Sequence, residues 1–211
     1  MSIKYQLKKI NDQFQENASP RAISVLSKSA EKLAKLRIEE GALKVGDTLP
    51  SFTLTNAVGE SVESSELLES GPLVMNFYRG AWCPYCNVEL SGYQDILENI
   101  HSKGAQLVAI SPEKPDNSLS LIEKHELKYE ILTDSNNDLA KELGLVFSLD
   151  TELKDLYKEF GIDLESAHGN QNFELPVPAT YVIDETGRVI MSYVNVDYTD
   201  RLEPEEVLTV L

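Results

Sequence analysis

The feature that most constrains this chain is its cysteine content: 211 residues contain only Cys83 and Cys86, spaced as C-x-x-C. A secreted scaffold held together by several disulfide bonds is excluded, because such a fold needs more cysteines. Two thiols three residues apart in a reducing compartment indicate redox chemistry or half of a metal site. The search for function therefore starts at this pair.

The residues around the pair predict a strand followed by a helix. A mostly apolar run at 73–78 is typical of a strand covered on both faces, and apolar residues recur at helical spacing over 90–100. Cys83 then lies at the helix N-cap and Pro84 in the first turn. Because Cβ atoms at i and i+3 of a helix are about 5–6 Å apart, against about 3.5–4.5 Å in a disulfide, a small adjustment closes a Cys83–Cys86 bond.

The thiols at this position are expected to be reactive. Unpaired N–H groups and the helix dipole favour a thiolate at a helix start, and the thiolate is the nucleophile. The net charge of −16 opposes another anion, so a nearby cation is needed. Arg79 is the only Lys or Arg between Glu60 and Lys103. We therefore assign Arg79 a supporting electrostatic role, with the helix terminus as the only other evident source of thiolate stabilisation.

Two alternatives to redox chemistry remain at the pair. Small buried cysteines can be inert core residues. They can also form half of a zinc site, but the available histidines, His101, His125 and His168, are widely spaced and fit no H-x₃₋₅-H pattern. We therefore predict no metal and no cofactor. His168 falls in an expected polar loop over 165–174 and is interpreted as a solvated histidine, the alternative being that it approaches the site.

Charge and hydropathy restrict the partners and the location of the protein. With 19 Lys and Arg against 35 Asp and Glu and no basic stripe, nucleic acid and anionic membranes are not expected partners. No run of about 18 apolar residues occurs, and residues 1–14 are amphipathic where a secretory signal is apolar. We expect a soluble, cytoplasmic protein.

The first residues differ chemically from the rest. Residues 1–45 hold nine basic and five acidic residues, net +4, whereas the remainder has a net charge of −20. One helix is predicted around residues 3–14, and a second begins with Ser19 as N-cap and Pro20 and continues to Gly41. We divide the chain into a helical arm, 1–43, and a redox domain, 44–211. The arm either packs on its own domain or pairs with a second copy as a homodimer.

The redox domain alternates strands and helices. The unit over 73–111 reads strand, helix, strand, which is a parallel crossover, and a turn at 185–187 joins an antiparallel hairpin. The predicted strands lie near 51–54, 73–78, 106–111, 129–132, 180–184 and 189–194, and the predicted helices near 64–69, 117–126, 136–143 and 150–160. The fold class is therefore α/β, with three layers and a mixed central sheet.

A family resemblance agrees with this arrangement. Trp82-Cys83-Pro84-Tyr85-Cys86 resembles the thioredoxin active-site motif, and Val177-Pro178-Ala179-Thr180 resembles the proline loop that faces the dithiol in thioredoxin folds with a cis bond. Residues 44–200 are similar to the peroxiredoxin family, in its alkyl hydroperoxide reductase/thiol-specific antioxidant branch, and most to a subgroup with a thioredoxin-style C-x-x-C. Residues 197–201 share this similarity. The resemblance implies a thioredoxin-like fold and hydroperoxide chemistry.

Most catalytic positions of that family carry other residues here. Its pattern is Pro-x-x-x-Thr-x-x-Cys, and the matching positions hold Arg79, Cys83 and Cys86, so the resemblance makes Cys86 the cysteine that attacks peroxide. The later arginine of the family falls on Pro178. The threonine and arginine that hold the peroxide are thus replaced, and a peroxidase slower than a standard member is expected. Arg79, Trp82 and Pro178 are the predicted supporting residues.

Three functions follow from these residues. In the first, Cys86 reduces a hydroperoxide, Cys83 closes an internal disulfide, and thioredoxin or a similar dithiol restores both. In the second, Cys83 is the nucleophile of a protein thiol-disulfide oxidoreductase. In the third, the dithiol switches a binding or dimerisation module. A lowered pKa at Cys83 would favour exchange and one at Cys86 would favour peroxide attack. Tyr78, Trp82 and Tyr85 either line an access groove or belong to the core.

Overall fold

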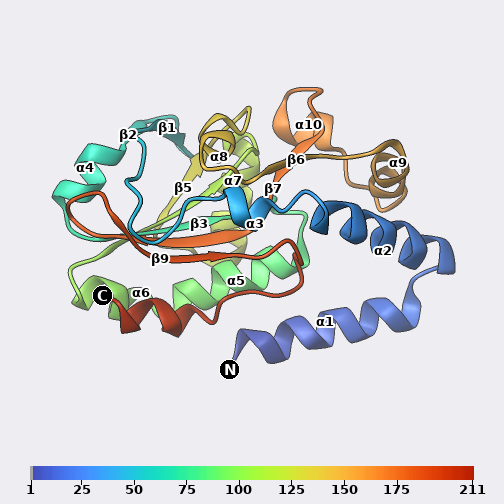
Figure 1. Cartoon of the computed structure of the whole chain (residues 1–211), viewed down its shortest axis with the longest axis horizontal. Coiled ribbons are helices and arrows are strands. Elements are labelled where there is room, and N and C mark those ends of the chain that lie inside the picture. Colours follow the sequence, from blue (N-terminus) through green and yellow to red (C-terminus); the bar gives the residue numbers. More distant parts are fainter. Residues whose placement is uncertain (1) are drawn as a thin grey trace.

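The fold is built on a seven-stranded mixed sheet, shown in a computed structural model that describes residues 2–211 (Figure 1). The strand order is β2-β1-β5-β4-β3-β8-β9, and β6 and β7 form a separate antiparallel pair. The strands are β1 (Thr53–Asn56), β2 (Ser61–Glu63), β3 (Leu73–Phe77), β4 (Gln106–Ser111), β5 (Glu130–Thr133), β6 (Val146–Ser148), β7 (Glu174–Pro176), β8 (Ala179–Ile183) and β9 (Val189–Val194). The central strands β3, β4 and β5 are parallel, whereas β8 and β9 form the predicted antiparallel hairpin. The mixed sheet is confirmed.

Helices cover both faces of the sheet, which confirms the predicted three layers. They are α1 (Ile3–Asn17), α2 (Pro20–Ala34), α3 (Ile38–Gly41), α4 (Ser64–Glu69), α5 (Pro84–Asp95), α6 (Leu97–Ser102), α7 (Pro115–His125), α8 (Asp138–Glu142), α9 (Thr151–Glu159), α10 (Leu164–His168) and the 3₁₀ helix η1 (Pro204–Thr209). Helices α5, α6, α7 and η1 pack on one face, and α4 and α8 on the other. None of these helices, within residues 2–211, has the length and apolar composition needed to cross a membrane.

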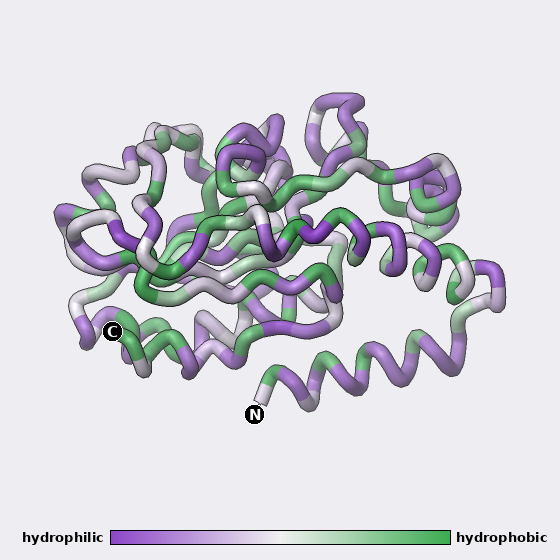
Figure 2. The backbone as a smooth tube through the Cα atoms, viewed as in Figure 1, coloured by the Kyte–Doolittle hydropathy of each residue, from purple (hydrophilic) through white to green (hydrophobic). Residues whose placement is uncertain are grey.

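Two hydrophobic cores result from the alternation of side chains along the central strands. In β3, Val74 joins the core beneath α5, whereas Met75 and Phe77 join the core beneath α8. All five residues of β3 are buried, as expected for a strand covered on both faces. Figure 2 shows that α1 is hydrophilic along most of its length, with hydrophobic residues recurring along it.

The helical arm packs against its own chain at two places. Ile3 and Leu7 of α1 are buried in the core beneath α5, and Ala22 and Val25 of α2 are buried with residues of α9. Glu203 fastens the start of α1, because its carboxylate accepts hydrogen bonds from the Ile3 and Lys4 N–H groups at 3.1 and 3.0 Å. Residues 2–43 therefore meet the rest of the chain through buried contacts.

The second arm helix is shorter than expected. Ser19 accepts a hydrogen bond from the Ala22 N–H and Pro20 is the first helical residue, as predicted. The helix ends at Ala34 and does not continue to Gly41, because Arg37 adopts a left-handed conformation with φ 54°. A separate short helix, α3, follows this break.

The expected polar loop over 165–174 is wrong over its first residues and correct over 169–173. Residues 165–168 belong to α10, which Asp163 caps by accepting from the Ser166 N–H and which ends at Gly169 with φ 73°. Glu174 is the first residue of β7. His168 is consequently buried and only 4% exposed, and burial lowers its pKa to about 4. The prediction of a solvated loop histidine is corrected, because a capped helix turns this side chain inward.

Candidate active site

The two cysteines lie at the junction between β3 and α5, as predicted. Cys83 is the N-cap residue with φ −91° and ψ 111°, and Pro84 is the first residue of the helix. The preceding loop is held from two sides, since the Glu113 carboxylate accepts from the Ala81 N–H at 2.7 Å and the Asn87 amide donates to the Ala81 carbonyl at 3.0 Å. The dithiol therefore stands on a fixed turn.

Gly80 is required in this turn. A Cβ atom at Gly80 would lie 2.4 Å from Trp82 Nε1 and 2.9 Å from Glu113 Cδ, and the residue has φ 153°. Any larger side chain would displace the tryptophan or the buried carboxyl group. The close approach of these two groups thus fixes a glycine four residues before the motif's proline.

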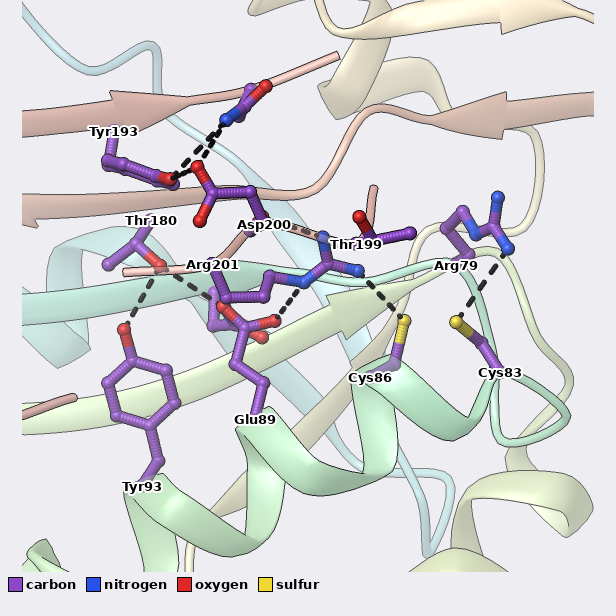
Figure 3. Close-up of polar contacts among 12 residues, drawn as sticks. Arg79, Cys83, Cys86, Glu89, Tyr93, Thr180, Tyr193, Thr199, Asp200 and Arg201 are labelled. Carbon is purple, nitrogen blue, oxygen red and sulfur yellow. Dashed lines mark hydrogen bonds and ion pairs between the residues drawn. The ribbon is translucent and has the colours of Figure 1, made fainter. Parts of the chain in front are cut away.

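Each thiol faces its own arginine (Figure 3). Cys83 and Cys86 are free, and both are fully buried. Arg79 Nη2 lies 3.7 Å from Cys83 Sγ, and Arg201 Nη2 lies 3.7 Å from Cys86 Sγ. Two guanidinium groups therefore lie beside the pair of sulfurs. The sequence analysis expected only one, that of Arg79.

Arg201 is the residue that the sequence analysis missed as a cation of the site. It lies in the segment after β9, is 1% exposed, and donates from Nε to Glu89 Oε2 at 2.9 Å. Glu89 is one turn beyond Cys86 on α5, so the ion pair and the thiol share a helix face. The expectation that Arg79 and the helix terminus alone stabilise a thiolate is therefore wrong. Arg201 is 115 residues from Cys86, and only its place in the similar segment 197–201 marked it.

Arg79 has a different environment. It is 5% exposed, donates from Nη1 to the Tyr157 hydroxyl at 3.2 Å, and stacks 4.0 Å from the Tyr198 ring centroid and 5.0 Å from that of Trp82. No carboxylate in residues 2–211 forms an ion pair with it, and its Nε atom has no hydrogen-bond partner there. Its charge is thus balanced by aromatic rings and by the Cys83 sulfur.

This asymmetry decides which thiol ionises first. Burial by itself raises the pKa of Cys83, but the hydrogen bond with Cys86 and the charges of Arg79 and Arg201 outweigh it, so the pKa of Cys83 lies well below its ordinary value. Burial and the adjoining Cys83 sulfur raise the pKa of Cys86 well above its ordinary value. Arg201 has Glu89 as an ion-pair partner at 2.9 Å, whereas no carboxylate in residues 2–211 pairs with Arg79. The charge of Arg79 is therefore the less compensated of the two, and the thiolate forms beside it.

Two buried carboxyl groups accompany the dithiol. Burial raises the pKa of Glu89 to about 7 against the opposing charge of Arg201, and burial raises the pKa of Glu113 to about 7 against the bond from Ala81. The negative charge of Cys83 raises both further. Both acids therefore titrate near neutral pH, as groups at functional sites often do.

The other predicted residues are distributed between core and site. Tyr78 is fully buried in the core, whereas Trp82 and Tyr85 line a cavity beside Arg79. Pro178 is buried between β7 and β8, but the peptide bond before it is trans, because residues 2–211 contain no cis bond. The expected cis proline is therefore wrong.

No cluster of three or more His, Cys, Asp or Glu able to hold a metal occurs in the described chain.

Comparisons with known proteins place this geometry among peroxiredoxins. The family model described as "AhpC/TSA family" matches residues 45–192. Peroxiredoxin Bcp of Escherichia coli is 30% identical over 103 residues, covering 49% of this chain and 65% of that protein. Peroxiredoxin Q of Gentiana triflora, a chloroplastic protein, is 28% identical over 150 residues, covering 71% of this chain and 58% of that protein. The chain thus spans less than two thirds of the length of these curated relatives.

A solved structure shows the same fold. The peroxidoxin BcpB of Mycobacterium tuberculosis superposes with a TM-score of 0.63 at 23% identity, covering 80% of this chain and 96% of that chain. The arrangement of sheet and helices is therefore that of a thioredoxin-like peroxiredoxin fold. The arm before residue 45 lies outside the family match.

Proposed function

Since this chain belongs to the AhpC/TSA family, we propose that it is a thiol peroxidase that reduces hydrogen peroxide or organic hydroperoxides with the Cys83–Cys86 dithiol. One observation carries the proposal: the two buried sulfurs lie between two guanidinium groups, each 3.7 Å from one sulfur. Such positive charge stabilises a thiolate in the resting protein and the negative charge that develops on peroxide oxygen during attack.

The proposed reaction has two steps at the dithiol. The Cys86 thiolate attacks the terminal oxygen of the hydroperoxide, the O–O bond breaks, an S–O bond forms, and the alkoxide leaves as an alcohol after taking up a proton. Cys83 then attacks the Cys86 sulfenic acid, an S–S bond forms, and water leaves. An external dithiol such as thioredoxin reduces the disulfide.

The assignment of attack to Cys86 rests on its match to the peroxidatic position and on Arg201. We infer that Cys86 passes its proton to the neighbouring Cys83 thiolate, and this transfer exchanges the two ionised forms. A thiolate of higher pKa is also the stronger nucleophile once formed. Arg201 supplies beside Cys86 the positive charge that the family arginine, replaced here by Pro178, provides elsewhere.

Peroxide consumption in the presence of thioredoxin and its reductase tests the function. Stopped-flow measurements should show turnover in the parent chain and none in Cys86→Ser. Cys83→Ser should still be oxidised once by peroxide but should not turn over with thioredoxin. A single oxidation by peroxide that persists in Cys86→Ser and is lost in Cys83→Ser reverses the assignment of the attacking cysteine.

A second candidate is protein thiol-disulfide exchange with Cys83 as nucleophile. The lowered pKa of Cys83 favours it, because that thiol carries the charge in the resting dithiol. Reduction of insulin disulfides measures this activity. A chain that reduces insulin and does not consume peroxide would be an oxidoreductase of this kind.

The remaining assignments concern assembly and location. We propose that residues 1–43 form an arm on a redox domain of residues 44–211. Exposed residues of the arm, among them Tyr5 and Leu36, pair two copies as a homodimer. The protein is cytoplasmic in this proposal. Sedimentation of the oxidised and reduced chain at several concentrations tests the pairing. A constant monomer mass under all conditions rejects both the dimer and the redox-switched module.

A further inference from the structure

A cavity lies between the helical arm and the turn that carries Cys83. Its volume is about 140 Å³, and Phe14 and Leu26 of the arm form one side of it. Trp82 and Pro84, the neighbours of Cys83 in the chain, form another. Neither cysteine belongs to the lining, so a ligand held here lies beside the dithiol without touching a reacting sulfur. The cavity depends on the arm, which precedes the segment that matches the family.

The lining, as far as residues 2–211 form it, is mostly aromatic and contains one charged side chain, that of Arg79. Phe14 and Phe160 meet edge to face with ring centroids 6.2 Å apart, and Phe160 is 45% exposed, so the cavity reaches the surface. The guanidinium carbon of Arg79 lies 4.0 Å from the Tyr198 ring centroid and 5.0 Å from that of Trp82, and both rings line the cavity. The positive charge therefore lies at the cavity wall.

The charge of Arg79 depends on the Cys83 thiolate for its balance. Arg79 is 5% exposed, no carboxylate of residues 2–211 pairs with it, and its Nε donor has no hydrogen-bond partner there. Asp197, which lines an adjoining cavity of about 40 Å³, accepts instead from the N–H and hydroxyl of Thr199 at 2.9 and 2.7 Å. The nearest counter-charge is therefore the Cys83 sulfur, 3.7 Å from Arg79 Nη2.

Oxidation of the dithiol removes this balance. The Cys83 and Cys86 sulfurs form an S–S bond and pass two electrons to the oxidant, and the Cys86 proton is released. With oxidised dithiothreitol as the oxidant, its S–S bond breaks and its two sulfurs take up two protons, one of them from the solvent. Arg79 then faces a neutral disulfide, and a buried charge without a partner costs free energy. An anion at the cavity wall offsets this cost in the oxidised protein, whereas the thiolate repels it in the reduced protein.

We propose that the cavity is a binding site for small aromatic carboxylates and that it binds them more tightly when the dithiol is oxidised. The carboxylate replaces the thiolate charge beside Arg79, and the ring lies among the aromatic side chains, since an apolar cavity of about 150 Å³ holds one benzene ring. Because linkage is reciprocal, the same ligand favours the disulfide over the dithiol by the same factor. The inference requires the disulfide to form, but it does not require peroxide to be the oxidant.

The fluorescence of Trp82, the only tryptophan of the chain, reports binding in the cavity that it lines. The protein is oxidised or reduced with dithiothreitol and titrated with benzoate, with benzamide as an uncharged ring, and with acetate as a charge without a ring. We expect benzoate to bind the oxidised protein about tenfold more tightly than the reduced protein. Benzamide should bind both states equally, and acetate should bind more weakly than benzoate. The inference is overturned if benzoate binds both states equally or without saturation, or if benzamide or acetate binds the oxidised protein as tightly.

A pair of variants tests whether the carboxylate lies at Arg79. Arg79→Met should lower the benzoate affinity of the oxidised protein by about tenfold, the effect of losing one hydrogen bond to a charged group, and should abolish the dependence on redox state. Arg37→Met changes an exposed arginine of the arm and should bind benzoate as the parent does. Unchanged benzoate binding in Arg79→Met rejects the site.

A redox equilibrium measures the same coupling in the parent chain. In a buffer of reduced and oxidised dithiothreitol, saturating benzoate should shift the protein toward the disulfide by about tenfold, which corresponds to about 30 mV. Alkylation of the free thiols followed by mass spectrometry measures the two forms. An unshifted equilibrium rejects the coupling even if Arg79→Met does not fold. Because dithiothreitol forms the disulfide here, both measurements remain decisive for a chain that does not consume peroxide.

Discussion

At the scale of single residues, the unbalanced charge of Arg79 controls the dithiol. Removing it in Arg79→Met should raise the pKa of Cys83, because the largest uncompensated cation near the thiolate is lost. In a Cys86→Ser background, which isolates Cys83, alkylation by iodoacetamide should persist below pH 7 with Arg79 and slow by about tenfold at pH 6 without it. Lys103→Met, an exposed lysine, is the control. Equal rates at pH 6 would contradict the role of Arg79.

Arg201 acts at the second sulfur through its planar fork. Its Nε binds Glu89 and its Nη2 reaches Cys86, a geometry that a lysine ammonium does not reproduce. Arg201→Lys should therefore lower kcat/KM for hydroperoxide by about a hundredfold, the usual effect of losing one donor to developing negative charge. Arg188→Lys, at an exposed arginine, should leave it unchanged. An unaltered kcat/KM in Arg201→Lys would remove this residue from the reaction.

Glu113, which binds the turn before Cys83, should make the free energy of unfolding depend on pH. Its pKa rises from 4.5 in the unfolded chain to about 7 in the folded protein, chiefly through burial. Between these values the folded state holds a proton that the unfolded state has released, so the free energy of unfolding falls as pH rises through this window, by up to about 3 kcal/mol.

Glu113→Gln keeps an acceptor for the Ala81 N–H and removes the titration. The stability of this variant relative to the parent should therefore increase between pH 5 and pH 8, measured by urea unfolding. Glu123→Gln changes an exposed acid on α7 and should follow the parent at both pH values. A parallel pH dependence in Glu113→Gln would show that the carboxyl group stays ionised when folded.

At the scale of elements, the contact between α1 and α5 depends on a missing side chain. A Cβ atom at Gly92 would lie 2.7 Å from Ile3 Cγ2 and 3.0 Å from Pro204 Cγ. Gly92→Ala should lower the free energy of unfolding by about 1–2 kcal/mol, since overpacking outweighs the gain in helix propensity. Gly41→Ala meets no atom within 4 Å and should be neutral or stabilising. Adding Ile3→Ala to Gly92→Ala should relieve the clash, seen as a non-additive double mutant.

Local patterns explain which elements the sequence predicted correctly. The short helix Ser64–Glu69, the strand Gln106–Ser111 and the N-cap at Ser19 agree with expectation, because their signals lie within a few neighbouring residues. Cys83 as N-cap followed the same logic. The end of α2 was missed because a left-handed Arg37 carries no strong signal of its own.

Long-range contacts explain what sequence patterns did not reveal at the site. Arg201 reaches Cys86 across 115 residues, and no local periodicity marks such a pair. His168 is buried by the packing of α10, although Asp163 and Gly169 did mark the ends of that helix. The cavity beside Arg79 needs the arm and the redox turn together, so neither segment alone predicts it.

At the scale of the whole molecule, the redox state should change stability in an unusual direction. A disulfide that closes so short a loop stabilises the fold by about 2 kcal/mol. Its formation also removes the thiolate that faces the buried Arg79, and a buried charge that loses its partner costs about 3–5 kcal/mol. We expect the reduced protein to be more stable than the oxidised protein by about 2 kcal/mol at pH 7.

Urea unfolding with and without a reductant measures this difference. The difference in free energy of unfolding between the reduced and the oxidised protein should become smaller below the lowered pKa of Cys83, because the reduced protein no longer holds a thiolate there. In Arg79→Met the order should reverse, since the buried cation is gone. An oxidised parent chain that is the more stable form at pH 7 would contradict the argument.

The bonds from Glu203 to the start of α1 also bear on how the protein acquires its activity. Ile3 and Glu203 are 200 residues apart in the sequence, and Arg201 lies two residues before this junction. Contacts of such sequence separation form slowly, because a long loop must close before they are made. During refolding the central sheet can assemble before the contact between Cys86 and Arg201 forms. Competence toward peroxide should therefore be the last property to return, after secondary structure and after the fluorescence of Trp82.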